Sequence, residues 1–223
     1  MKINVLKSYD ELSSTAADIV EKQLKKQPLS KLVLPTGSTP LGMYKELIKR
    51  ELDWSHTITF NLDEYLMNPD HPCSYHSFMR KNLFDRTNIY PDHCHFPYRP
   101  TLSFEDKMYA NKGIDLCILG IGTNGHIAFN EPGSSFLSRT RVVNLDEQTI
   151  QDNSRFFGSV DDVPKQAITM GLATIMESKR IVLMVNSVDK LNILNVAMDG
   201  EVTESVPASI LQRHNNVEVY YCD

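Results

Sequence analysis

The chain has 223 residues, of which 41% are hydrophobic and 23% charged, and its formal net charge is −5. These values are ordinary for a soluble globular protein, and a net negative charge argues against a surface that binds nucleic acid or anionic membranes. No stretch approaches the ~18 to 20 apolar residues of a membrane span, and the start of the chain, MKINVLKSYDEL, is no signal peptide. Four widely spaced cysteines without a Cys-x-x-Cys pair predict free thiols and a cytoplasmic location.

Strand-like and helix-like segments alternate along the whole chain. Short apolar runs predict strands at residues 2–6, 31–34, 57–62, 94–98, 114–119, 142–145, 180–185 and 217–221. Apolar residues at helical spacing predict helices at 9–26, 41–50, 75–84, 164–176 and 190–198, with one brief helix within 85–112. The polar segment 148–163 is expected to be irregular.

This alternation, with no linker and no internal repeat, predicts an α/β fold. We expect residues 1–223 to form one domain around a single doubly wound, mostly parallel sheet with helices on both faces, a Rossmann-like arrangement. Ligands bind such sheets at the carboxyl ends of the strands. Polar residues that directly follow a strand are therefore the candidates for a site.

The most informative strand end is the glycine-rich stretch 120–133, GIGTNGHIAFNEPG, which follows the buried run 114–119. Glycines allow a tight turn that exposes polar groups, and His126 lies five residues before Glu131, a carboxylate able to orient it. The two can act as an acid–base pair. A turn that contains one hydrogen-bonded histidine is the simpler structural interpretation.

Residues 120–125 also match G-x-G-x-x-G, the fingerprint of dinucleotide-binding folds. That fingerprint opens a helix directly after its third glycine, whereas Pro132 and Gly133 would stop such a helix within a few residues. The match also lies in the middle of the chain rather than in a first βαβ unit. We therefore expect no nicotinamide or flavin cofactor.

Residues 36–39, TGST, follow another predicted strand and open a helix. Their N–H groups and hydroxyls can bind a phosphate, or they can simply cap the helix. Arg155 and Lys190 are candidate phosphate partners further along the chain, Arg as a planar fork and Lys as a point charge. Most such residues are solvated surface, so each is weak evidence alone.

Asp63 and Glu64 end the predicted strand at 57–62. A half-sheltered carboxylate at this edge can serve as a general base, because burial sets its pKa. A helix cap or a salt bridge is the more frequent role of a lone Asp.

Histidines and cysteines gather in two places, at residues 71–76 and 93–95. Their spacings fit no standard zinc-ligand pattern, and both places are interrupted by prolines or lie in loops. We expect no metal site.

Taken together, these pieces resemble the glucosamine-6-phosphate deaminase family, also called glucosamine-6-phosphate isomerases. The resemblance spans nearly the whole chain, and its most specific part is HIAFNEPG. The matching stretches are LPTGSTP (34–40), FNLDEY (60–65), GIGTNGHIAFNEPGS (120–134), SRTR (138–141), NSRFF (153–157), VPKQAITMG (163–171) and VPASILQRH (206–214).

The resemblance implies roles for individual residues. His126 would move a proton at the sugar ring oxygen and open the pyranose, and Glu131 would orient His126. Asp63 would then carry the C2 proton to C1, and loss of the C2 amine as ammonia would give fructose 6-phosphate. Asn124 joins this catalytic set, and no metal or organic cofactor is needed. The substrate-binding residues would be Gly37, Ser38, Thr39, Gly125, Arg155 and Lys190.

Three features depart from the family pattern. Asn124 stands where the best-known members have Asp, so we expect a lower pKa for His126 than in an Asp form. Arg141 is retained, but Val143 stands where allosteric members have Lys and the chain ends at Asp223. We therefore expect no activation by N-acetylglucosamine 6-phosphate. The segment 97–112 also looks shorter than usual.

Other functions remain open. Galactosamine 6-phosphate differs from glucosamine 6-phosphate only at the C4 hydroxyl, and the sequence does not distinguish the two substrates. A 6-phosphogluconolactonase-type hydrolase and a non-catalytic sugar-phosphate sensor are further alternatives. The segment 145–163 is expected to be a mobile lid, because it carries Arg155 and has little apolar material. The oligomeric state, monomer or homo-oligomer, is left open.

Overall fold

A seven-stranded sheet forms the centre of the computed structural model, which describes residues 1–98, 102–110 and 113–223. All neighbouring strands are parallel, in the order β1-β10-β9-β6-β2-β3-β5. The predicted α/β fold is confirmed. The strands are β1 (Ile3–Val5), β2 (Lys31–Leu34), β3 (Ile58–Asn61), β5 (Cys94–His95), β6 (Leu116–Leu119), β9 (Ile181–Asn186) and β10 (Val217–Cys222).

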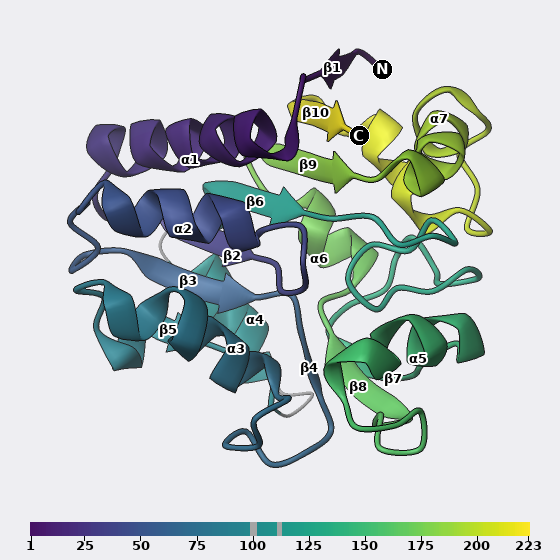
Figure 1. The fold of residues 1–223 in the computed structure, drawn as a ribbon, viewed down its shortest axis with the longest axis horizontal. Coiled ribbons are helices and arrows are strands. Elements are labelled where there is room, and N and C mark those ends of the chain that lie inside the picture. The colour runs from purple at the N-terminus through teal and green to yellow at the C-terminus, as the bar shows by residue number, and fades with distance from the viewer. Residues whose placement is uncertain (99–101, 111–112) are drawn as a thin grey trace.

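Helices cover both faces of this sheet, as expected. Helices α1 (Tyr9–Lys26), α2 (Leu41–Lys49) and α3 (Tyr75–Asn82) lie in front of the sheet in Figure 1, and α4 (Leu102–Tyr109) and α6 (Leu172–Met176) lie behind it. Helix α7 (Leu191–Asp199) belongs to the same apolar cluster as α6. No helix of the described residues is long and apolar enough to cross a membrane.

Alternate residues of each strand serve the two apolar cores. In β6, Leu116 and Ile118 pack with α1 and α2, whereas Cys117 and Leu119 pack with α6 and α7. Both faces of the strand are therefore buried, which explains why the sequence of a parallel strand is apolar without interruption.

The direction in which the chain winds reverses between β2 and β6. From β2 the chain moves outward through β3 to β5, then returns to β6 on the other side of β2 and moves outward through β9 and β10. The loops that follow β2 and β6 therefore leave the sheet on either side of a crevice, which is the usual ligand site of such folds. These loops contain TGST and the glycine-rich stretch 120–133.

A second sheet of three antiparallel strands was not predicted. Its order is β4 (Asp63–Tyr65), β8 (Gln166–Thr169) and β7 (Arg141–Asn144), with Asp63 opposite Thr169. Only Leu62 separates β3 from β4, and its carbonyl accepts a hydrogen bond of 2.7 Å from the backbone N–H of Met170. The chain thus passes directly from one sheet into the other at Asp63, as Figure 1 shows below β3.

The prediction of a helix at 164–176 is wrong. Its first part is β8, and only Leu172–Met176 is helical. Pairing with β4 and β7, which are distant in sequence, outweighs the local helical pattern. Gly171 separates the two parts and lies against another segment, because a Cβ at this position would be 2.1 Å from the Ser138 carbonyl oxygen.

The segment 148–163 is more ordered than predicted. Helix α5 (Glu147–Asn153) begins after Asp146, whose side chain accepts a hydrogen bond from the backbone N–H of Gln148, and a 3-10 turn (Ser154–Phe156) follows it. Further 3-10 turns are Phe84–Arg86, Pro91–His93, Val188–Lys190 and Pro207–Arg213. The other predicted elements agree with the structure within a few residues. The expectation of a short segment at 97–112 falls partly on 99–101 and 111–112, which lie outside the described residues.

Candidate active site

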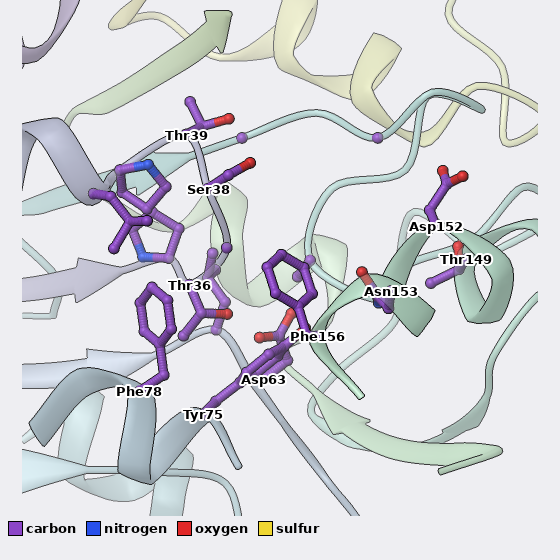
Figure 2. A pocket seen from close by; sticks show the side chains of 18 of the residues that line it. Thr36, Ser38, Thr39, Asp63, Tyr75, Phe78, Thr149, Asp152, Asn153 and Phe156 are labelled. Carbon is purple, nitrogen blue, oxygen red and sulfur yellow. The ribbon is translucent and has the colours of Figure 1, made fainter. Parts of the chain in front are cut away.

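A pocket of about 790 Å³ lies at the carboxyl edge of the parallel sheet, around the crevice between the loops that follow β2 and β6. Figure 2 shows Ser38 and Thr39 on one side of this pocket, and Thr149, Asp152 and Asn153 of α5 on the other. Seven residues predicted to belong to a site line it: Gly37, Ser38, Thr39, Asp63, His126, Arg155 and Lys190. Asn124, Gly125 and Glu131 do not line it and lie in the loop that carries His126.

The loop after β2 turns with its backbone toward the pocket. Gly37 has a φ of +92°, a left-handed conformation that favours glycine. The Tyr9 hydroxyl donates to the backbone carbonyls of Ser38 and Thr39 and accepts from the N–H of Gly42, so the loop is fixed from α1. Such a loop in front of a helix N-terminus can bind an anion through N–H groups and hydroxyls.

Arg155 and Lys190 are neighbouring cations that line the same pocket, and Lys81 is a third cation in its lining. Burial lowers the pKa of Lys190, and the nearby charge of Arg155 lowers it further, while Asp152 acts in the opposite direction. In the described part of the chain, no salt bridge joins Arg155 or Lys190 to a carboxylate. Two neighbouring positive charges without a carboxylate partner favour an anionic ligand between them.

Asp63 is 6% exposed and lines the pocket. Burial raises its pKa well above the usual range, and the charge of Glu64 adds to this effect. Figure 2 shows Asp63 below the TGST loop, in the part of the pocket that also contains Tyr75 and Phe156. A raised pKa in a pocket is typical of a general acid or base.

Glu64, the neighbouring carboxylate, has a different environment. Its two oxygens accept hydrogen bonds of 2.8 to 2.9 Å from the backbone N–H groups of Tyr65, Tyr75 and His76. Burial still raises its pKa, although these three bonds act against the rise. Glu64 therefore fixes the start of α3, whereas Asp63 faces the pocket.

His126 lines the pocket and is hydrogen-bonded to residues that do not line it. Its Nδ1 lies 3.1 Å from Glu131 Oε2, which also accepts a 2.8 Å bond from Asn124 Nδ2. Burial opposes ionisation of Glu131, but the bonds from His126, Thr149 and Asn124 outweigh it and lower the pKa of Glu131. Glu131 is thus a carboxylate that can hold the Nδ1 proton of His126 and leave Nε2 for a substrate.

Two glycines make room for this arrangement. A Cβ on Gly122 would lie 2.2 to 2.6 Å from ring atoms of His126, so only glycine allows the imidazole to occupy its position. Gly125 has a φ of +86° and its carbonyl accepts a bond from the N–H of Ala208, which fixes the loop from behind. Gly122 was not singled out from the sequence, although its place in G-x-G-x-x-G was visible.

Several lining residues were also missed. Thr36, Tyr75, Asn153 and Thr149 line the pocket. Thr36 belongs to the TGST motif and Asn153 to the NSRFF stretch, but Tyr75 and Thr149 are common residue types on helices, and no sequence signal marked them. Among the described residues, no group of three or more His, Cys, Asp or Glu side chains is placed to bind a metal ion.

The family model for glucosamine-6-phosphate isomerases and 6-phosphogluconolactonases matches residues 7–220. The chain belongs to this family. Its curated relatives include glucosamine-6-phosphate deaminase 2 of Bacillus subtilis (strain 168), which is 49% identical over 233 residues, covering 98% of this chain and 94% of the relative. Glucosamine-6-phosphate deaminase of Thermoanaerobacter sp. (strain X514) is 46% identical and covers 98% of this chain and 91% of the relative.

Solved structures separate the two branches of this glucosamine-6-phosphate isomerase and 6-phosphogluconolactonase family. A structure described as a monomeric glucosamine-6-phosphate deaminase superposes with a TM-score of 0.95 at 40% identity, covering 100% of this chain and 97% of that one. The 6-phosphogluconolactonase of Thermotoga maritima superposes with a TM-score of 0.77 at 21% identity, covering 99% and 98%. The second match shows a shared fold only.

The raised pKa of Asp63 predicts that Asp63→Asn stabilises the protein at neutral pH. The folded state prefers the protonated acid, so stability falls as pH rises from the unfolded-state pKa of about 4 through the raised folded-state value. Asn does not ionise, and the variant should melt at a higher temperature at pH 8, by about 2 to 4 °C for each kcal/mol removed. At pH 4 the two melting temperatures should converge, and calorimetry at both pH values measures this.

Asp53 provides a control of opposite sign. Bonds from Ser55 and Asn88 lower its pKa to about 2, so its carboxylate form is favoured in the folded state. Asp53→Asn should therefore lower the melting temperature at pH 8. A lower melting temperature for Asp63→Asn at pH 8 would contradict the assignment of an uncompensated buried acid.

Proposed function

We propose that the chain converts glucosamine 6-phosphate and water into fructose 6-phosphate and ammonia. The observation that supports this most is a single pocket that contains a buried carboxyl group, an imidazole held by a carboxylate, and two neighbouring cations. This set matches the needs of an amino-sugar phosphate isomerisation. The names of relatives 46% and 49% identical to this chain support the same substrate.

Substrate binding is assigned to the TGST loop and the two cations. In this proposal the phosphate lies against the N–H groups and hydroxyls of Gly37, Ser38 and Thr39, and Arg155 and Lys190 neutralise its charge. The sugar then extends along the pocket toward Asp63 and His126.

Ring opening comes first, because only the open aldehyde makes the C2 proton acidic. His126 Nε2 takes the proton of the C1 hydroxyl and returns it to the ring oxygen, so that the bond between C1 and the ring oxygen breaks. Glu131 keeps Nδ1 protonated and stabilises the imidazolium that forms in between.

Isomerisation follows at Asp63. Its carboxylate removes the proton from C2 while the C1 oxygen takes up a proton from solvent, which gives an enolamine across C1 and C2. Asp63 then returns its proton to C1, and the nitrogen at C2 loses a proton to solvent. The C2 amine is then a ketimine, water adds at C2, and ammonia leaves as the ketone of fructose 6-phosphate forms. No step in this sequence changes an oxidation state outside the sugar, and acid–base groups of this kind each contribute about 10² to 10⁴-fold.

The decisive experiment measures ammonia release from glucosamine 6-phosphate and from galactosamine 6-phosphate. We expect release from the first, and a fall of about 10² to 10⁴-fold in Asp63→Asn because the variant has no base at C2. Hydrolysis of 6-phosphogluconolactone, measured in parallel, tests the other branch of the family.

Each result selects one function. Release from galactosamine 6-phosphate alone would keep the mechanism and change the substrate. Lactone hydrolysis that persists in Asp63→Asn would indicate a lactonase, since that reaction moves no C2 proton. Binding of a sugar phosphate without turnover of any of the three compounds would indicate a sensor.

Asn124 takes part in the hydrogen bonds around His126. Its amide donates to Glu131 and its carbonyl oxygen accepts from the His126 N–H at 3.1 Å, so it adds hydrogen bonds but no charge. Asn124→Asp would place a second carboxylate beside Glu131 and raise the pKa of His126. Since neutral His126 starts ring opening, the low-pH limb of the pH–rate profile should move to higher pH. An unmoved profile would contradict this role.

We propose that residues 145–163 act as a lid. Leu145 and Val163 are buried in one apolar cluster at the two ends of this segment, whereas Phe156 between them is 44% exposed at the pocket. A sugar phosphate bound to Arg155 should hold the segment closed and slow limited proteolysis within it. Cleavage at the same rate with and without fructose 6-phosphate would refute the lid.

The four free cysteines support a cytoplasmic location.

A further inference from the structure

Helix α5 has seven residues, and one of its side chains, Thr149, is buried with 2% exposure. The residues on either side of it in the helix, Gln148 and Ile150, are exposed and half-buried. A buried hydroxyl requires a hydrogen-bond partner. If only apolar packing mattered at this position, valine would fit as well as threonine. The identity of this partner is therefore informative.

The Thr149 hydroxyl lies against the acid–base pair. Its Oγ1 is 3.4 Å from His126 Nδ1, the nitrogen that also faces Glu131 Oε2 at 3.1 Å. Thr149 is one of the groups that lower the pKa of Glu131 against the effect of burial. The hydroxyl thus lies within hydrogen-bond distance of the His126 ring, from an element that is not part of the catalytic loop.

Helix α5 is attached to the catalytic loop at a second point. Thr123 Oγ1 donates to Asp152 Oδ2 at 3.0 Å, and Gln148 Nε2 donates to the other oxygen of Asp152 at 2.8 Å. Figure 2 shows Thr149 and Asp152 projecting from the same helix. The helix continues directly into the turn that carries Arg155. The positions of the His126–Glu131 pair and of Arg155 therefore both depend on α5.

We propose that Thr149 is a positioning residue, whose hydroxyl fixes the His126 ring with its Nδ1 proton directed to Glu131. The inference rests on the function proposed above. With Nδ1 held, Nε2 is the nitrogen that exchanges a proton with the sugar. One contact to Glu131 leaves the imidazole free to swing, whereas a second contact from another element restricts it to the reactive orientation.

Thr149→Val keeps the shape of the side chain and removes the hydroxyl. We expect kcat for ammonia release to fall about 10- to 100-fold, the loss typical of a hydrogen bond to a charged group. KM should change by less than about twofold, because the phosphate contacts remain. A Val variant with the kcat of the wild type would overturn the proposal.

Two further substitutions at Thr149 separate the effect of the hydroxyl on kcat from the effect of side-chain packing. Thr149→Ser keeps the hydroxyl and loses only the methyl group, so it should restore most of kcat. If Thr149→Val does not fold, Thr149→Ala removes the hydroxyl without adding a methyl group, and the same loss is expected. A Ser variant as impaired as the Ala variant would show that packing alone matters.

Thr174 offers a matched control elsewhere in the chain. It is also 2% exposed, and its hydroxyl donates to the buried carboxylate of Glu105 at 2.7 Å, on α6 and away from the lining of the pocket. Thr174→Val should lower the melting temperature but leave kcat unchanged. A comparable loss of kcat in both Val variants would indicate a general effect of stability and would count against a role for Thr149.

An NMR titration keeps this test independent of turnover. The 15N shift of His126 Nδ1 in histidine-labelled protein follows protonation of the His126–Glu131 pair, and the charged residues that line the pocket beside it are Asp63, Lys81, Asp152, Arg155, Asp189 and Lys190. Since the Thr149 hydroxyl favours the carboxylate form, the step in which Glu131 is protonated should move to higher pH in Thr149→Val. An unmoved step refutes the inference. Absence of ammonia release in the wild type would instead refute the proposed function.

Discussion

The antiparallel pairing of β4 with β8 is the constraint on which the pocket depends. It takes the chain out of the parallel sheet directly after β3 and places Asp63 opposite Thr169. Thr169 Oγ1 in turn accepts a 3.0 Å bond from the N–H of Phe129 in the loop that carries His126. One strand pair therefore brings a carboxyl group that follows β3 and an imidazole that follows β6 to the same cavity.

The pocket concentrates groups that would be more stable elsewhere. Asp63 and Glu64 are adjacent and both buried, yet only Glu64 receives backbone hydrogen bonds that compensate its charge. Two carboxyl groups in one dipeptide thus have separate environments, one hydrogen-bonded to the backbone and one facing the pocket. Arg155 and Lys190 likewise lie close enough for their charges to repel each other, an arrangement that lowers stability and is common in ligand-binding sites.

The sequence predicted the parallel sheet and seven of the residues that line the pocket, because apolar runs and glycine-rich turns are local signals. It did not predict β4 and β8, whose pairing joins residues about a hundred positions apart, and it assigned 164–176 to a helix for the same reason. Nor did it reveal the buried hydroxyl of Thr149, since burial on an exposed polar helix arises only from the packing of α5 on the loop around His126. Gly122 could be read from the glycine motif, but its tight contact with the His126 ring is apparent only in the structure.

The proposed phosphate contacts of Arg155 and Lys190 have a consequence for the direction of the reaction. In the proposed reaction a phosphate group is present in both glucosamine 6-phosphate and fructose 6-phosphate, so Arg155 and Lys190 would contribute the same binding energy to substrate and product. Such uniform binding raises the affinity for both and favours neither. The product should therefore occupy the pocket in competition with fresh substrate, and the departure of ammonia, which these cations do not hold, becomes the event that separates forward from reverse turnover.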